Sequence, residues 1–116
     1  MSRFKTATEP TRMTIFRVFA LACLTVLPAL GMAAGDSDRG RELAERYRCI
    51  TCHGVEGRSP DRRYPHLAGQ QPAYLVTRLQ YFRDGIEPFN EMNGHARPLT
   101  DEMMQDLAAY FSEQRL

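Results

Sequence analysis

Two cysteines and a histidine stand together in the run Cys49-Ile50-Thr51-Cys52-His53. Thiols three positions apart lie on one side of a helical turn, so they can form thioether bonds to two vinyl groups at one edge of a haem. The histidine that follows the second thiol is then carried beneath the macrocycle, where a ring nitrogen can bind iron. This spacing predicts one covalent haem, haem c, attached through Cys49 and Cys52 with His53 as an axial ligand.

The ligand on the other side of the iron must come from a different part of the chain. The residues that could supply it are Met92, Met103, Met104, His66 and His95. Met92 is favoured because it lies in an irregular stretch between two predicted helices, where the backbone can bring a thioether over the iron without breaking a helix. Met104 falls on the apolar stripe of a helix, which favours a place in the core. His95 is three residues from Met92 and stays open as an alternative.

A histidine that binds a metal usually donates its second ring N–H to an orienting partner. Pro65 is the candidate, through its backbone carbonyl, because the loop after His53 can return beneath the haem and proline holds that carbonyl rigidly. A neutral thioether such as that of Met92 stabilises ferrous iron and raises the reduction potential. Two protein ligands also leave no open coordination position, so the predicted site favours electron transfer over substrate activation.

Three stretches have the apolar periodicity of amphipathic helices, and no segment alternates like a strand. The first covers residues 38–48, and the second covers 72–85, from a proline suited to the first turn to a glycine suited to the stop. The third follows Thr100, a favourable N-cap. The connections 54–71 and 86–99 are long. We therefore expect an all-α fold of three main helices with long loops around one haem.

The N-terminal third is typical of an export signal. Arg12 and Arg17 precede the apolar run 18–30, and small residues follow as far as Ala34. This apolar run is shorter than the ~20 residues of a membrane span. We expect residues 1–34 to be a signal peptide, with Met13 as a second candidate initiator, and residues 35–116 to be the haem domain in the periplasm. An uncleaved segment that anchors the protein in the membrane is the alternative.

Removal of this segment takes away four of the 15 basic and one of the 14 acidic residues, so the mature chain has a net charge near −2 and contains no lysine. This composition carries no nucleic-acid signature. Arg58, Arg62 and Arg63 cluster after the haem motif. They are explained either as a solvent-exposed loop or as a patch facing the haem propionates or an acidic redox partner.

From Gly40 onward the chain resembles the class I c-type cytochromes, in particular the small bacterial periplasmic ones and the single lobes of their two-haem relatives. The resemblance rests on an ordered set of motifs: Gly40, Cys49-Ile50-Thr51-Cys52-His53-Gly54, Tyr64-Pro65-His66-Leu67-Ala68-Gly69-Gln70, Tyr74-Leu75 with Leu79, Phe82-Arg83-Asp84-Gly85, Met92 before Leu99-Thr100-Asp101, and Leu107-Ala108-Ala109-Tyr110-Phe111.

This resemblance implies the small cytochrome c fold, with Cys49 and Cys52 as thioether sites and His53 and Met92 as axial ligands. It also implies that the Pro65 carbonyl accepts a hydrogen bond from the His53 ring. The first and last helices should cross near the glycine and tyrosine at positions 40 and 110.

Two features depart from the family pattern. Gly40 lies nine residues before Cys49, where eight is common. The stretch 86–98 contains Glu87-Pro88-Phe89-Asn90-Glu91 in place of the usual arginine-rich run.

The sequence thus predicts a periplasmic electron-transfer protein, not an enzyme, which cycles one electron through a His/Met-ligated haem c. Its partners would be redox proteins, with no nucleic acid and no stable membrane insertion after signal cleavage. One alternative is a haem c subunit of a larger dehydrogenase or reductase. Another is a haem sensor or peroxidase-like protein with an exchangeable sixth ligand. A thiol–disulfide module using Cys49 and Cys52 is the least favoured, because such motifs follow a strand.

Overall fold

The structure is a computed structural model that describes residues 34–116. Its elements are helices only: α1 (Ser37–Arg46), α2 (Cys49–His53), the 3-10 helix η1 (Val55–Gly57), α3 (Pro72–Arg83), α4 (Glu91–Ala96) and α5 (Asp101–Ser112). Of these, α1, α3 and α5 are the three main helices, which confirms the predicted all-α class. The predicted signal peptide, with Met13, lies outside the described residues apart from Ala34. None of the helices between residues 34 and 116 has the length and apolar character needed to cross a membrane.

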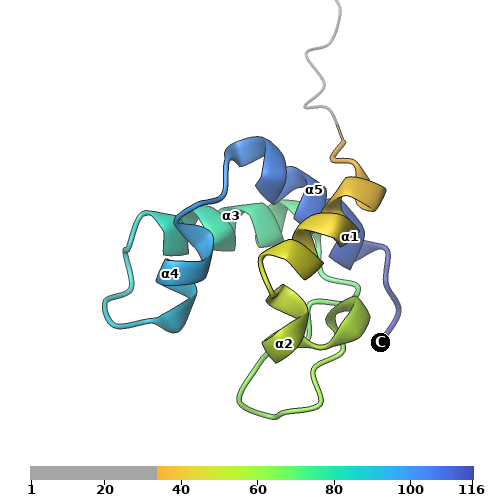
Figure 1. Ribbon diagram of the computed structural model, residues 1–116, viewed down its shortest axis with the longest axis horizontal. Helices are drawn as coiled ribbons and strands as arrows, with labels where there is room; N and C mark the ends of the chain where they lie inside the picture. Colours follow the sequence, from red (N-terminus) through yellow and green to blue (C-terminus); the bar gives the residue numbers. More distant parts are fainter. Residues whose placement is uncertain (1–33) are drawn as a thin grey trace, which may run out of the picture.

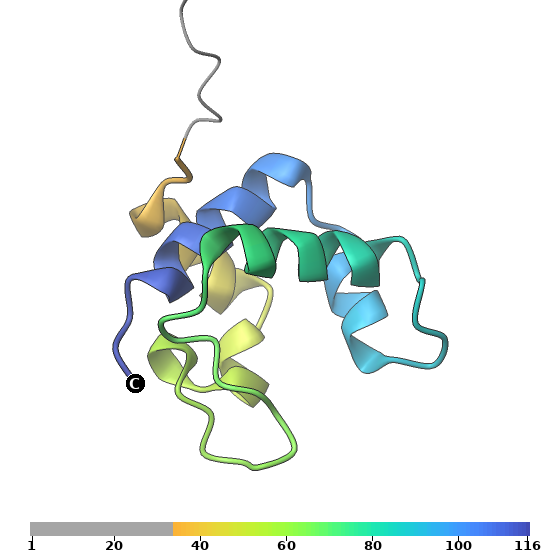
Figure 2. The same ribbon diagram turned by 180° about the vertical axis from the view of Figure 1, so that it is seen from behind.

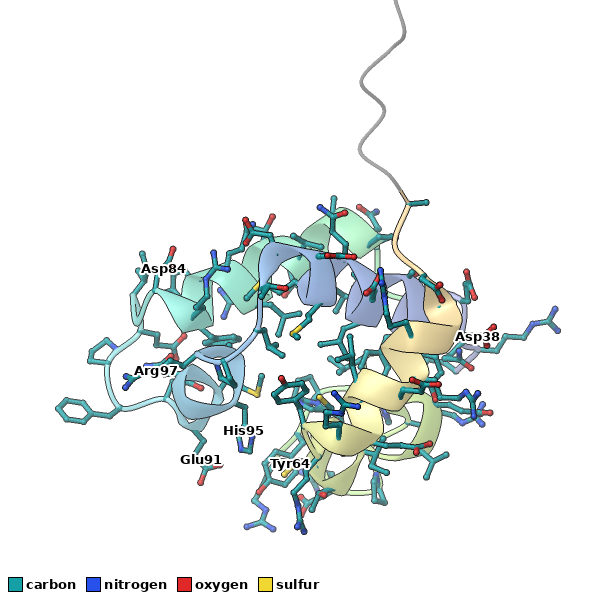
Figure 3. The ribbon with its side chains drawn as sticks, turned by 45° about the horizontal axis from the view of Figure 1, so that its top comes forward. Asp38, Tyr64, Asp84, Glu91, His95 and Arg97 are labelled. Atoms are coloured by element: carbon teal, nitrogen blue, oxygen red, sulfur yellow. The ribbon has the colours of Figure 1, made fainter. Side chains whose placement is uncertain are left out.

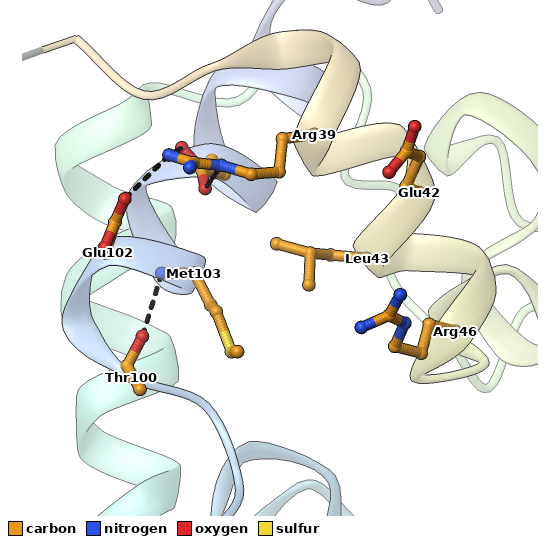
Figure 4. A pocket seen from close by; sticks show the side chains of 8 residues that line it. Arg39, Glu42, Leu43, Arg46, Thr100, Glu102 and Met103 are labelled. Carbon is orange, nitrogen blue, oxygen red and sulfur yellow. Dashed lines mark hydrogen bonds and ion pairs between the residues drawn. The ribbon is translucent and has the colours of Figure 1, made fainter.

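Local chemistry explains where the main helices begin. The side chain of Asp36 accepts a hydrogen bond from the backbone N–H of Arg39 at the start of α1. Thr100 does the same for Met103 at the start of α5 (Figure 4), and Pro72 occupies the first turn of α3. Each cap satisfies a backbone donor that the helix leaves free. The predicted helix starts at Thr100 and Pro72 are confirmed.

The first and last helices cross at Gly40. A Cβ atom at this position would overlap the backbone oxygen of Asp106 and lie 2.8 Å from the Cβ of Tyr110, so only glycine allows the approach. The predicted crossing near Gly40 and Tyr110 is confirmed. Helix α3 packs on α5 as well, and Figures 1 and 2 show α2 and α4 well separated, below the layer that α3 and α5 form.

Apolar side chains of α1, α3 and α5 form the core. Its buried members are Leu43, Ala44, Leu75, Leu99, Met104, Leu107, Ala108, Tyr110 and Phe111. Met104 is fully buried, which agrees with its predicted place in the core. Aliphatic and aromatic burial of this kind is the main source of stability in a domain this small.

One carboxylate is buried beside the crossing. Asp106 is 2% exposed and accepts hydrogen bonds from Arg39 Nε at 2.6 Å and from the backbone N–H of Asp36 at 2.8 Å. Arg39 also pairs with Glu102 (Figure 4). A buried charge is tolerated when it is paired and hydrogen-bonded. The cluster fixes the start of α1 against α5.

Two predicted helix ends and one predicted placement differ from the structure. Helix α1 ends at Arg46 because Arg48 adopts a left-handed conformation, with φ 60°, and turns the chain into α2. Helix α3 ends at Arg83, two residues before the predicted stop. The expectation that Met92 lies in irregular chain is wrong, because Met92 belongs to the first turn of α4. That helix has six residues, too few to give a periodic apolar pattern.

Candidate haem site

A cavity of about 570 Å³ lies between the segment that follows α1 and the segment that carries α4. Its lining includes Cys49, Cys52, His53, Pro65 and Met92. Residues of α3 and α5 complete the walls with apolar surface, namely Leu75, Leu79, Phe82, Leu107, Ala108 and Phe111. The volume falls within the roughly 300–1,000 Å³ typical of cofactor pockets. All the residues that the sequence assigned to the haem therefore face one cavity.

The imidazole of His53 is 6% exposed and held by the backbone. Its Nδ1 lies 2.9 Å from the carbonyl oxygen of Pro65. A carbonyl can only accept, so Nδ1 carries the proton and donates it, and Nε2 is the nitrogen left to bind a metal. The ring of Tyr64 meets the His53 ring at an interplanar angle of 67°, with centroids 6.4 Å apart.

We call residues 49–69 the proximal segment. Its return loop is tied down by main-chain hydrogen bonds. The carbonyl of Gly57 accepts from the N–H of Leu67 at 2.8 Å, and the N–H of Gly69 donates to the carbonyl of Phe111 in α5 at 3.0 Å. These bonds do not depend on side-chain chemistry. They set the position of the Pro65 carbonyl and so the orientation of the His53 ring.

Ser59 links the loop to the haem motif. Ser59 is 9% exposed, and its hydroxyl lies 3.0 Å from the Cys52 carbonyl oxygen and 2.9 Å from the Asp61 carbonyl oxygen, so its single proton is shared between these two acceptors. The backbone N–H of Ser59 donates to Nδ1 of His66 at 2.9 Å. His66 is exposed on the proximal segment and is among the residues that line the cavity.

Cys49 and Cys52, the two cysteines among the described residues, are half-buried and form no disulfide with each other. Burial raises the pKa of the Cys49 thiol to about 11, from an ordinary value of 9.0, because a thiolate is poorly stabilised against apolar walls.

The opposite wall comes from residues 86–98, which we call the distal segment. Met92 is half-buried and lines the cavity from α4, and His95 lines it from the same helix but is exposed. Figure 3 marks His95 and Glu91 on α4 and Tyr64 on the proximal segment across from it. Met92 and His95 thus both reach the cavity from the distal segment, with Met92 the more buried, while the candidate His66 lines it from the proximal segment.

The remaining methionine candidates lie elsewhere. Met104 is in the core, and Met103 accepts a weak hydrogen bond from the Tyr47 hydroxyl at 3.8 Å. Met103 lines a second cavity of about 380 Å³ between α1 and α5 (Figure 4), whose rim carries the charges of Arg39, Glu42, Arg46, Glu102 and Asp106. Neither methionine is among the residues that line the larger cavity.

Two arginines of the cluster after the motif have acidic partners. Arg58 pairs with Glu56 and donates to the Arg115 carbonyl at 2.8 Å. Arg63 lines the larger cavity and pairs with Asp61 at 2.6 Å. This contact lowers the pKa of Asp61 to about 2. The local excess of positive charge is therefore smaller than the sequence cluster suggests.

Sequence reasoning missed the polar residues that support both walls. Ser59 looked like an ordinary loop residue, and only the fold brings it to the Cys52 carbonyl. Asn90 carried a signal that could have been used, because an asparagine followed by Glu91 is a typical helix start. It caps α4, where its side chain accepts from the Met92 N–H.

The donor set fits a haem. Two half-buried thiols, an oriented imidazole and a thioether surround a largely apolar cavity of cofactor size. The fold and the site define the class of helical proteins that attach haem through cysteine sulfur.

Comparison with known proteins identifies the family. The family model for cytochrome c matches residues 37–114. Cytochrome c4 of Pseudomonas aeruginosa is 39% identical over 90 residues, covering 78% of this chain and 44% of the relative. The thiosulfate dehydrogenase electron acceptor of Thiomonas intermedia is 41% identical over 98 residues, covering 84% and 43%. The crystal structure of reduced cytochrome c4 from Pseudomonas stutzeri matches with a TM-score of 0.64 at 40% identity, over 71% of this chain and 47% of that one.

The chain belongs to the cytochrome c family, and it binds haem c covalently through Cys49 and Cys52. It spans about half the length of these relatives.

Proposed function

We propose that this protein is a one-electron carrier of the bacterial periplasm whose haem iron is held between His53 and Met92. The observation that carries the proposal is that these two side chains line the same cavity from separate segments. Protein side chains would then hold the iron from both sides. When bound, the haem supplies one-electron redox chemistry at its iron.

The residues around His53 hold its imidazole in one orientation and one tautomer. The hydrogen bond from Nδ1 to the Pro65 carbonyl fixes the tautomer and the ring angle. A carbonyl partner is neutral, so it leaves the imidazole less electron-rich than a carboxylate partner would. Together with the soft thioether of Met92, this arrangement favours the ferrous state and a raised reduction potential.

Met92 is favoured over His95 as the distal ligand because its side chain is half-buried in the cavity wall, whereas His95 is exposed. An exposed histidine would have to leave water to bind. Met92 is the second residue of α4, and its backbone N–H is bonded to Asn90, so its backbone position is defined.

Donors and acceptors for such a carrier would be redox proteins. The name of the Thiomonas intermedia relative describes an electron acceptor of thiosulfate dehydrogenase. This agrees with a free carrier and is also compatible with a haem c subunit of a larger complex. A sensor or peroxidase-like role would need an exchangeable sixth position, against which Met92 argues. A thiol–disulfide role would need a lowered thiol pKa, whereas burial raises that of Cys49.

Spectroelectrochemical titration of the purified protein, followed by exposure of the reduced form to carbon monoxide, tests this function. We expect a single one-electron wave and carbon monoxide binding too slow to compete with electron exchange. Rapid, stoichiometric carbon monoxide binding would contradict the carrier function and favour the sensor or peroxidase-like alternative.

A further inference from the structure

The backbone around Met92 is held by the amide side chains of Asn90 and Asn93. Oδ1 of Asn90 accepts a hydrogen bond from the Met92 N–H at 2.9 Å, and Nδ2 of Asn90 donates to Glu87 Oε1 at 3.0 Å. Asn90 therefore connects the start of α4 to a carboxylate five residues before Met92. A second amide repeats the connection, because Nδ2 of Asn93 donates to the Glu87 backbone carbonyl at 2.7 Å.

Glu87 in turn joins the distal segment to α3. Its Oε2 lies 3.7 Å from Nη2 of Arg78. The Arg78 guanidinium lies over the rings of Tyr81 and Phe82, 4.5 and 4.6 Å from their centroids. Because both charged side chains are partly exposed, the ion pair itself adds little stability. The stacked guanidinium nevertheless gives Glu87 a partner in a fixed place.

Helix α4 needs such support. Six residues are far below the length at which a helix is stable alone, and its main packing partner is α3. Asn93 Oδ1 is buried and has no hydrogen-bond partner among the described residues. Its other amide atom closes the turn that holds Met92.

We propose that Arg78, Glu87, Asn90 and Asn93, which we call the distal bracket, form a positioning device that holds Met92 at the haem cavity and so controls how readily the sixth coordination position opens. The inference rests on the proposed function, because it requires Met92 as the distal ligand. Met92 has a long, flexible side chain. Its residence at the iron should therefore depend on how firmly the backbone of α4 is held.

The test measures the rate at which imidazole binds to the oxidised holoprotein, together with the reduction potential. Asn90→Ala removes both hydrogen bonds of the Asn90 side chain, to the Met92 N–H and to Glu87. We expect imidazole to bind about fivefold faster and the reduction potential to be lower. Fivefold corresponds to ~1 kcal/mol for a lost helix cap. Asn90→Ser restores the cap acceptor and should return the rate to within about twofold of the wild type.

Thr100→Ala is the matched control. It removes the equivalent cap of α5, where Thr100 accepts from Met103, and Thr100 is not among the residues that line the haem cavity. It should lower the unfolding temperature while leaving the imidazole rate and the potential unchanged. Glu87→Ala removes the contact with Arg78 and the acceptor of the Asn90 amide but leaves the cap of α4 in place. It should accelerate binding two- to threefold and gives a second reading if Asn90→Ala folds poorly.

Wild-type imidazole kinetics and potential in folded Asn90→Ala, or equal acceleration in Thr100→Ala, would overturn the bracket. Met92→Ala separates this failure from that of the proposed function. If Met92→Ala binds imidazole rapidly while Asn90→Ala behaves as the wild type, only the bracket fails. If Met92→Ala also behaves as the wild type, Met92 is not the ligand and the function proposed for this site fails with it.

Discussion

The proximal and distal segments hold their side of the haem cavity by different means. On the proximal side, main-chain hydrogen bonds fix the return loop and a backbone carbonyl orients His53. On the distal side, hydrogen bonds of the asparagine and glutamate side chains hold the backbone around Met92 in place. Main-chain contacts survive most substitutions, whereas side-chain contacts are lost one residue at a time. We infer that variation within this fold changes the distal ligand field more easily than the proximal one.

The largest expected effect is that of removing the distal ligand. Met92→Ala should lower the reduction potential by on the order of 0.1–0.2 V, a modest part of the roughly 0.8 V that axial ligation spans. It should also open the reduced iron to carbon monoxide. His95→Ala is the matched control and should leave both properties unchanged. If His95→Ala lowered the reduction potential and Met92→Ala did not, His95 would be the distal ligand in place of Met92.

A pair of glycines compares the rigid helix crossing with the loosely held α4. Gly40→Ala places a Cβ against the backbone of α5 and should reduce the free energy of unfolding by about 2–3 kcal/mol, at the upper end of overpacking effects. A Cβ at Gly94, in α4, meets nothing within 4 Å. Gly94→Ala should therefore stabilise the protein by about 0.5–1 kcal/mol and slow imidazole binding.

Chemical denaturation of both variants measures the changes in the free energy of unfolding, and imidazole kinetics of Gly94→Ala measures how firmly α4 is held. Destabilisation by Gly94→Ala would show that α4 is already as firmly held as the crossing.

Ser59 tests whether proximal side chains matter less to the iron than distal ones. Ser59→Ala removes the hydroxyl that lies within hydrogen-bond distance of the Cys52 and Asp61 carbonyl oxygens and that accepts from the Asp61 N–H. It should reduce the free energy of unfolding by about 1–2 kcal/mol. The reduction potential should not change, because the Pro65 carbonyl remains in place. A potential shift as large as that of Asn90→Ala would remove the distinction between the two segments.

The smallest effect is expected in acid. Contact with Arg63 lowers the pKa of Asp61 to about 2, below its ordinary 3.8. The stabilisation from this carboxylate is therefore present above pH 3.8 and is lost as the pH falls through about 2. The unfolding temperature of the wild type should drop relative to that of Asp61→Asn only in this window. If the unfolding temperatures of the wild type and Asp61→Asn fell in parallel from pH 5 to pH 2, the Asp61–Arg63 pair would not contribute to stability.

Sequence patterns predicted the parts of the site whose chemistry is local. The Cys49–His53 spacing and the Thr100 cap depend on neighbours within one turn, so they could be read directly. The Gly40 crossing was reached through the family resemblance, whereas the Pro65 carbonyl was predicted from the loop after His53 and was also implied by the resemblance. The bracket around Met92 and the Ser59 contact with Cys52 depend on where distant segments meet. No periodic pattern encodes such contacts. A helix of six residues such as α4 is also too short to give a periodic apolar pattern, so it could not be predicted either.

Proton NMR of the reduced protein gives the most direct test of the ligand pair. The porphyrin ring current shifts a methionine methyl group far upfield when its sulfur binds the iron. We predict one such resonance, lost in Met92→Ala and retained in Met103→Ala and His95→Ala. Persistence of the resonance in Met92→Ala, or its absence from the wild type, would contradict iron held between His53 and Met92.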